Sequence, residues 1–360
     1  SPTIDGQWAK KSPKRTGGYF MVEFTPATLN QTIEYAKAGG IEYIMFLGNW
    51  RVSTGHYNVS DAWGGLAGLK QAVATIRESG LKAGIHTLSA NIPGDKYITP
   101  VPDPRLAKTG GLFLEADITA TQKAIPIAQS TAGLPKRYGH IIPRAGVDML
   151  IDDEIVRYGS ANTEAPFALE DCVRGLHGTK RAEHKAGAEV FHLTQMYGYV
   201  PNPNTTLLGE IAGNIARVYV EAGFSMIYFD GLEGFDSLNA PDREAANPGG
   251  NTAQAMFQQA FWDRLPKDPV TKAPLCDLLV EGSSGQASSG SFRWHANTRS
   301  GQTDWAATDP RSYFDFVKKR SVNSTMDTAL ITADLGWWGY LRWTPAYHAT
   351  LPAEIGYMAA

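Results

Sequence analysis

The sequence is poor in cysteine and has no long apolar run. Only Cys172 and Cys276 occur in 360 residues, and they form no C-x-x-C pair, which excludes a disulfide scaffold and a cysteine-bound metal. We expect two buried thiols, although a bridge between them stays open. The longest apolar stretches, such as residues 224–229, are far shorter than the ~20 residues that span a bilayer, so we expect no membrane partner.

An excess of charge of either sign is also lacking. The chain has 33 Lys and Arg against 36 Asp and Glu, a formal charge of -3, and no basic run, so we expect no nucleic-acid partner. No H-x-H or H-E-x-x-H spacing occurs, and we therefore predict neither a metal nor another cofactor. A metal held by His86 and Asp230 is a minor alternative.

The first ninety residues repeat one pattern, in which a short β-rich apolar run is followed by a polar loop and a helical segment that ends in glycine. Strands that alternate with helices must lie parallel, because each helix returns the chain to the same edge of the sheet. The predicted elements are strands at 18–24, 42–47 and 81–88 and helices at 27–38 and 67–79.

Residues 98–193 lose this helical rhythm and contain turn signals and alternating runs, which predicts an inserted antiparallel β domain. Its acidic run Asp152, Asp153 and Glu154 lies between two apolar segments. We interpret these residues as a hairpin turn or edge rather than a metal site, since charged residues at a turn explain them equally well.

The α/β rhythm then resumes, with predicted helices at 205–222, 253–265, 313–321 and 351–360 and strands at 224–230, 276–280 and 328–333. This gives six strands, or seven if residues 190–197 join them. The fold class is therefore α/β, a (β/α)8-type (TIM) barrel of residues 1–97 and 194–360 with an inserted domain at 98–193. Eight strands need more chain, so either the barrel is incomplete or the sequence is a fragment, which the stop within a helix favours. An open doubly wound sheet competes, but its Gly-rich phosphate fingerprint is missing.

Functional residues in parallel α/β folds lie at the carboxyl ends of strands. Carboxylates follow several predicted strands, and Asp230 is the sharpest candidate because it comes directly after a fully apolar run. The predicted catalytic residues are Asp230, Glu281 and Asp334, with Glu233 as a partner of Asp230. The predicted substrate-binding residues are Asn49, Trp50, Arg51, His56, His86, Tyr197, Tyr228, Trp337 and Trp338.

Carboxylates beside aromatic rings are typical of saccharide sites, because sugar C–H faces stack on Trp and Tyr and cleavage of a glycosidic bond uses two carboxylates. We therefore predict a glycoside hydrolase that acts on a polysaccharide or oligosaccharide, in a secreted or periplasmic bacterial protein. Two alternatives stay open. One is a polysaccharide lyase acting by β-elimination on uronate-containing glycans, and the other is a non-catalytic glycan-binding barrel.

Residues 80–86, preceded by a helix, and residues 226–231 resemble the third and fourth strands of the barrel glycoside hydrolases related to α-galactosidases. The resemblance implies that Asp230 is the nucleophile after strand four and that Asp334 is the general acid/base after strand six. Tyr228 stands where that family has a lysine.

Overall fold

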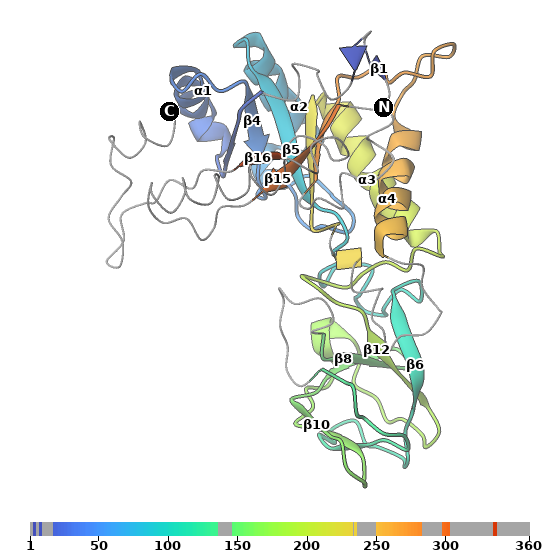
Figure 1. The fold of residues 1–360 in the computed structure, drawn as a ribbon. Coiled ribbons are helices and arrows are strands. Elements are labelled where there is room, and N and C mark those ends of the chain that lie inside the picture. The colour runs from blue at the N-terminus through green and yellow to red at the C-terminus, as the bar shows by residue number, and fades with distance from the viewer. Residues whose placement is uncertain are drawn as a thin grey trace, which may run out of the picture.

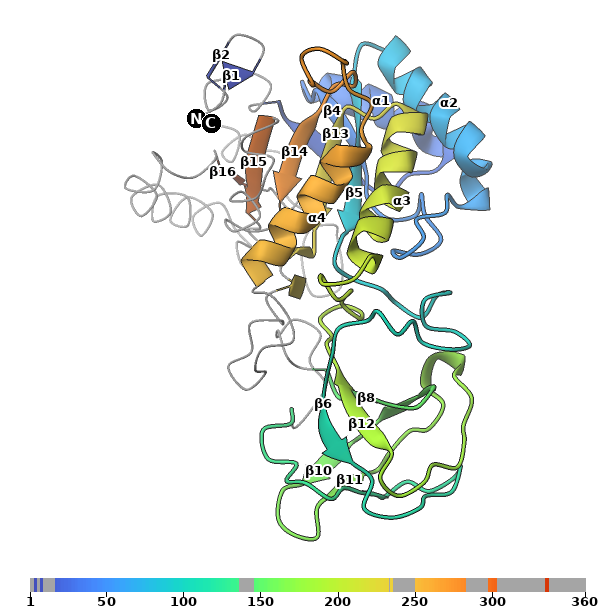
Figure 2. The ribbon, with the colours of Figure 1, turned by 90° about the vertical axis from the view of Figure 1, so that its right-hand side faces the viewer.

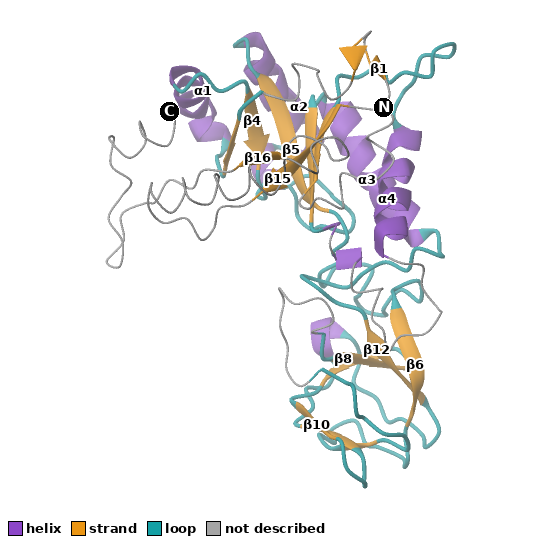
Figure 3. Cartoon of the chain, in the orientation of Figure 1, coloured by secondary structure: helices purple, strands orange, loops and turns teal. Residues whose placement is uncertain are grey.

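The computed structural model describes residues 17–135, 146–232, 234–235 and 250–282 and the short strands at 3–4, 7–8, 297–302 and 334–336. The chain forms two parts, an α/β unit and, below it in Figure 1, a β module made of residues 108–193. Helices occur almost entirely in the α/β unit, whereas the β module consists of strands and loops (Figure 3).

A seven-stranded sheet forms the centre of the α/β unit, and all of its strand pairs are parallel. Its strands follow one another across the sheet in chain order, as in a (β/α) barrel. They are β3 (Tyr19–Val22), β4 (Tyr43–Phe46), β5 (Lys82–Leu88), β13 (Met226–Asp230), β14 (Leu279–Gly282), β15 (Asn297–Gln302) and β16 (Asp334–Gly336).

Helices cover the outer face of this sheet. They are α1 (Leu29–Ala38), α2 (Gly65–Glu78), α3 (Leu207–Ala222) and α4 (Gly250–Arg264), with short 3-10 turns at Pro26–Thr28 and Asp61–Trp63. Buried residues of α3 recur at helical spacing, for example Leu208, Ile211 and Ile215, because only one face of the helix packs on the sheet. The helix ends at Gly223, whose φ of 83° suits glycine, as the sequence predicts.

The sheet curls around its own apolar interior. Side chains of β4 alternate, so that Ile44 and Phe46 pack under the helices while Tyr43 and Met45 face inward and join Met226, Tyr228 and Leu279 in a separate cluster. The hydroxyl of Tyr19 on β3 donates a hydrogen bond to Glu281 on β14, although β4, β5 and β13 lie between them in the sheet. The predicted α/β barrel class is therefore confirmed.

Three strand predictions need correction. The sequence analysis missed β15, because its residues Asn297–Gln302 are polar and carry no apolar run. Residues 190–197 do not join the barrel, since β12 (Glu189–Leu193) pairs antiparallel with β6 and β8 in the β module. The strand predicted at 276–280 lies at Leu279–Gly282, and the segments predicted at 313–321, 328–333 and 351–360 lie outside the described residues.

The β module contains two antiparallel sheets. One has the order β6-β12-β8-β9 and the other β10-β11-β7. The strands are β6 (Lys108–Phe113), β7 (Ile125–Pro126), β8 (Asp148–Ile151), β9 (Glu154–Arg157), β10 (Ser160–Asn162), β11 (Ala168–Glu170) and β12, with a 3-10 turn at Leu176–Gly178. Near the N-terminus, β1 (Thr3–Ile4) and β2 (Gln7–Trp8) form a separate two-stranded sheet. None of the described helices has the length and apolar composition to cross a membrane.

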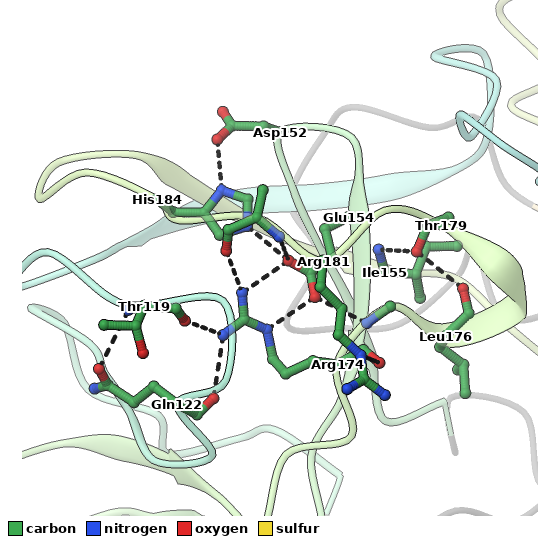
Figure 4. A network of polar contacts seen from close by, with 12 residues as sticks. Thr119, Gln122, Asp152, Glu154, Ile155, Arg174, Leu176, Thr179, Arg181 and His184 are labelled. Atoms are coloured by element: carbon green, nitrogen blue, oxygen red, sulfur yellow. Dashed lines mark hydrogen bonds and ion pairs between the residues drawn. The ribbon is translucent and has the colours of Figure 1, made fainter.

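The acidic run of the β module forms a hairpin, as predicted. Asp152 and Asp153 make the turn between β8 and β9, and Glu154 points into the module, where it is 1% exposed. Glu154 pairs with both Nε and Nη2 of Arg174 and with Nε2 of His184 (Figure 4). No group of acidic, His or Cys side chains suited to a metal occurs in the described ranges, and Cys172 and Cys276 are free thiols.

Candidate functional site

The carboxyl ends of β5, β13 and β14 bring three polar residues to the inner face of the curled sheet. Tyr228 is in register with His86 on one side and with Glu281 on the other. Asp230 lies two residues beyond Tyr228 and therefore faces the same way. In Figure 2 the arrowheads of β5 and β14 point toward the β module, so this end of the sheet is the one from which the insertion leaves.

Asp230 is held on both carboxylate oxygens. Its Oδ2 lies 3.1 Å from Nε2 of His86, and its Oδ1 accepts the N–H of Gly231 at 2.8 Å. Gly231 has a φ of 72°, a left-handed conformation that allows this tight turn. The Asp230 side chain is 27% exposed, whereas that of His86 is 8% exposed. Asp230 is therefore a fixed carboxylate that solvent still reaches.

Three residues after β4 hold the end of β5. Nη1 of Arg51 donates to the carbonyl oxygens of Leu47 and His86, at 3.2 and 3.1 Å. Trp50 Nε1 donates to the same His86 carbonyl at 3.3 Å, and the Tyr57 hydroxyl donates to the Leu88 carbonyl at 2.9 Å. Burial lowers the pKa of Arg51, while the nearby Tyr57 and Asp230 act in the opposite direction. Burial raises the pKa of Tyr57.

Glu281 is fully buried and lies one inward-facing position below Asp230 in the sheet. The Tyr19 hydroxyl donates to its Oε1 at 2.5 Å. From the spacing of neighbouring strands and the rise per residue, the Cα atoms of Asp230 and Glu281 are roughly 8 Å apart. Two carboxyl groups on adjacent strands thus face one interior, with different surroundings.

Four further residues predicted to bind substrate lie in environments that differ from one another. They are Trp50, Tyr228, Asn49 and Tyr197. Trp50 and Tyr228 are buried and present no ring face to solvent. Asn49 donates through Nδ2 to the Phe24 carbonyl at 2.7 Å. Tyr197 is 41% exposed, and its N–H donates to Oδ1 of Asn91 at 3.1 Å.

His56 is not brought to Asp230 by any observed contact. Its ring stacks on Tyr97 at 4.1 Å, and its Nδ1 lies 3.2 Å from Oδ2 of Asp95. The Tyr97 hydroxyl in turn donates to Glu210 of α3, so this histidine belongs to the packing of the loop on that helix. Glu233, Trp337 and Trp338 lie outside the described residues.

Asp334 is the first residue of β16 and does not follow a strand end. Through Ser300 and Gly282 it is in register with Phe229, one residue before Asp230. Because β15 precedes it, β16 is the seventh parallel strand and not the sixth. The placement of Asp334 after strand six, which the α-galactosidase resemblance implies, is therefore wrong, whereas Asp230 does end the fourth strand.

Sequence reasoning missed Tyr19, whereas it placed Asn91 after the third strand without giving it a role. Tyr19 begins its strand, and a search of strand ends passes over it, although it reaches Glu281 across the interior. Asn91 follows β5 by three residues and fixes the backbone of Tyr197. No signal in the sequence pointed to Tyr19.

No protein-family model matches the sequence, and no curated protein sequence matches it. Solved structures are similar. A family GH13_31 enzyme has a TM-score of 0.50 at 12% identity, covering 91% of this chain and 60% of that chain. Trehalulose synthase MutB from Pseudomonas mesoacidophila MX-45 has a TM-score of 0.48 at 11% identity, covering 87% and 56%. Isomaltulose synthase PalI from Klebsiella sp. LX3 has a TM-score of 0.44 at 10% identity, covering 87% and 56%.

The parallel sheet, its outer helices and the module inserted after the third strand define the class of (β/α)-barrel proteins with a β insertion. Among solved structures, this fold is similar to that of the family GH13_31 enzyme. At 12% identity this similarity concerns the fold alone, and the chain covers 60% of the length of that protein.

Proposed function

We propose that this protein is a carbohydrate-active enzyme that cleaves glycosidic bonds, with Asp230 as the carboxylate that acts on the sugar. One observation carries the proposal: Asp230 ends the fourth barrel strand, stays partly exposed and is fixed by His86 and the Gly231 N–H. The Gly231 N–H stabilises a negative carboxylate, and so does His86 when its Nε2 carries the proton of the contact; a negative carboxylate is the form that a nucleophile or general base needs.

Glu281 is the proposed second carboxyl group. Cleavage of a glycosidic bond requires one ionised carboxylate and one that gives a proton to the leaving oxygen. Glu281 lies on the next strand, faces the same interior and is buried beside the Tyr19 hydroxyl, so its surroundings differ from those of Asp230. Such a difference between two carboxyl groups is what separates an acid from a base in one site. Glu233, which lies outside the described residues, stays proposed as a further carboxylate of the site.

The test replaces Asp230 with asparagine and measures turnover on a panel of plant, algal and animal polysaccharides. We expect Asp230→Asn to lower kcat by about 10²–10⁴-fold or more, with an unchanged melting temperature. Asp263→Asn is the matched control, because Asp263 is a carboxylate on α4 whose observed partner is Gln259. Release of reducing ends without unsaturation supports hydrolysis, whereas reducing ends together with an unsaturated, ultraviolet-absorbing product identify a lyase instead. Glycan binding without any turnover, unchanged in Asp230→Asn, would establish a binding barrel and overturn the proposal.

A further inference from the structure

Arg51 is a fixed cation beside the proposed catalytic carboxylate. It follows β4, and a single nitrogen, Nη1, makes both of its hydrogen bonds, to the carbonyl oxygens of Leu47 and His86. Its guanidinium carbon lies 5.4 Å from the Trp50 ring centre and 5.9 Å from that of Tyr57. These contacts fix the plane of the guanidinium, so the direction of its other N–H groups is fixed too.

The remaining donors of Arg51 are unused. Within the part of the chain that the structure describes, Nε and Nη2 make no hydrogen bond, and no carboxylate forms an ion pair with this residue. Arg174 offers a contrast, because it uses Nε, Nη1 and Nη2 and pairs with Glu154. Arg51 is therefore a cation whose Nε–H and Nη2–H groups are free to donate to a ligand.

This arrangement leaves two donors open to an anion. Arg51 is only partly exposed, so a guanidinium that gives up its remaining water on binding is stabilised best by a negative partner. Asp230 is near enough to act on Arg51 electrostatically, but its Oδ2 is committed to His86. A bound ligand can therefore supply the negative group that the open N–H groups of Arg51 would take.

We infer that Arg51 binds the carboxylate of a uronic acid residue in the saccharide that Asp230 attacks. This inference rests on the proposed function and narrows its substrate from polysaccharides in general to acidic ones. A carboxylate fits because its two oxygens match two parallel N–H groups of a guanidinium. The nearness of Arg51 to Asp230 places that carboxylate on the sugar at the cleavage point or on its neighbour. A sulfate ester offers a similar anion, and a sulfated galactan without carboxyl groups is assayed beside the acidic substrates to distinguish it.

The experiment compares each polysaccharide with its own neutral form. Polygalacturonate, alginate and hyaluronan are assayed before and after chemical reduction of their carboxyl groups to alcohols, and kcat/KM is measured for each. The wild-type protein should prefer the best acidic substrate over its reduced form by about 30-fold or more, the loss expected when one partner of a desolvated charge pair is removed. Arg51→Gln should lose this preference, because its kcat/KM should fall far more on the acidic form than on the reduced form.

Two further variants separate recognition from folding. Arg51→Lys keeps the charge without the fork and should recover only part of the preference. Arg181→Gln is the matched control, since Arg181 in the β module is exposed and donates through Nε to the carbonyl of Arg174. It should leave the preference unchanged. Equal losses of Arg51→Gln on acidic and reduced substrates would assign Arg51 a structural role only and overturn the inference, as would a preference for sulfated over carboxylated glycans.

Binding measurements distinguish this failure from failure of the proposed function. Calorimetry on Asp230→Asn, with and without Arg51→Gln, reports affinity for uronate oligosaccharides without turnover. Arg51-dependent binding in a protein that cleaves no glycan supports the inference and rejects the hydrolase. If the protein cleaves neutral glycans and Arg51→Gln changes nothing on acidic ones, the hydrolase proposal stands and the inference about Arg51 fails.

Discussion

The Nε2 atom of His86 lies 3.1 Å from Oδ2 of Asp230, and Nδ1 of the same ring lies 2.8 Å from the carbonyl oxygen of Leu47. A carbonyl oxygen only accepts, so Nδ1 carries a proton. The contact with Asp230 then needs a second proton, either on Nε2 or on the carboxyl group. The pair therefore holds one proton more than a neutral imidazole and a carboxylate, and this proton fixes Asp230 in one orientation.

His86→Ala is expected to lower kcat by about 10- to 100-fold and to change KM little, because the carboxylate keeps its place on the strand but loses its orienting donor. Steady-state kinetics on the best substrate of the panel measures both constants. His86→Gln offers an amide N–H and should lose less. Thr87→Ala is the control, since Thr87 is the next residue and also bonds a backbone carbonyl, that of Tyr228. A larger effect on KM than on kcat would show that His86 serves binding and does not orient Asp230.

Tyr19→Phe removes the hydroxyl that donates to Glu281 and leaves the ring in place. If Glu281 is the proton donor, its protonation then changes, and the acidic or basic limb of the kcat profile should move along the pH axis. We expect kcat at the optimum to fall by about 10-fold. Tyr35→Phe is the matched control, because the Tyr35 hydroxyl accepts a bond from Gln31 on exposed α1. An unshifted pH profile in Tyr19→Phe would remove Glu281 from the chemistry.

The barrel and its insertion were predictable from the sequence because apolar periodicity follows burial. Strand 226–230 is buried on both faces and reads as a continuous apolar run, so Asp230 stood out at its end. β15 gave no such signal, since its six residues, Asn297–Gln302, are polar. Because β15 was not counted, Asp334 was predicted to follow the sixth strand, although it lies on the seventh.

The site was only partly predictable, because contacts across the barrel depend on curvature and register. His86 and Asp230 meet because they face the same side of neighbouring strands near the carboxyl ends of those strands, which the sequence suggested. The contact between Tyr19 and Glu281 joins residues 262 positions apart at opposite heights of their strands. The unused fork of Arg51 depends on which carbonyl oxygens its Nη1 reaches. Neither feature leaves a pattern along the chain.

Glu154 gives the β module a pH-dependent stability. Burial alone raises the pKa of its carboxyl, but hydrogen bonds from Arg174, His184 and the Ala182 N–H outweigh burial and hold this pKa below its ordinary value of 4.5. A carboxyl whose pKa is depressed by folding contributes stability that is complete above the unfolded value and is lost as the pH falls through the folded one. The contribution should therefore be constant from neutral pH down to about 4.5 and decline below it.

Glu154→Gln is expected to lower the free energy of unfolding by about 3 kcal/mol at neutral pH, because Arg174 stays buried without its counter-charge. Urea denaturation at about pH 7 and about pH 3 measures the difference from the wild type, which should shrink in acid. Glu164→Gln, a change at an exposed loop residue of the same module, should have little effect at either pH. A difference that grows in acid would contradict the depressed pKa of Glu154.

Asp148 joins the β module to the chain that returns to the barrel. It is fully buried and accepts hydrogen bonds from Gln195 Nε2 at 2.8 Å and from the Tyr199 hydroxyl at 2.7 Å. Tyr199 also pairs through its backbone with Ile92, beyond the end of β5. Leu150 of the module belongs to the same apolar cluster as the outer core of the barrel. The module keeps an apolar cluster of its own, but these contacts tie it to the barrel core, and a single cooperative unfolding transition is expected.

Tyr199→Phe should lower the free energy of unfolding by about 1.5–3 kcal/mol, because a bond to a buried carboxylate is lost and Asp148 keeps fewer donors. Differential scanning calorimetry measures both this shift and the number of transitions. Tyr158→Phe is the control, since the Tyr158 hydroxyl donates to a neutral acceptor, the Pro135 carbonyl, inside the module. It should cost less, because a bond to a charged acceptor contributes more than one to a neutral carbonyl. Two separate transitions in the wild-type protein would contradict the coupling of the module to the barrel core, because the module would then unfold without the barrel.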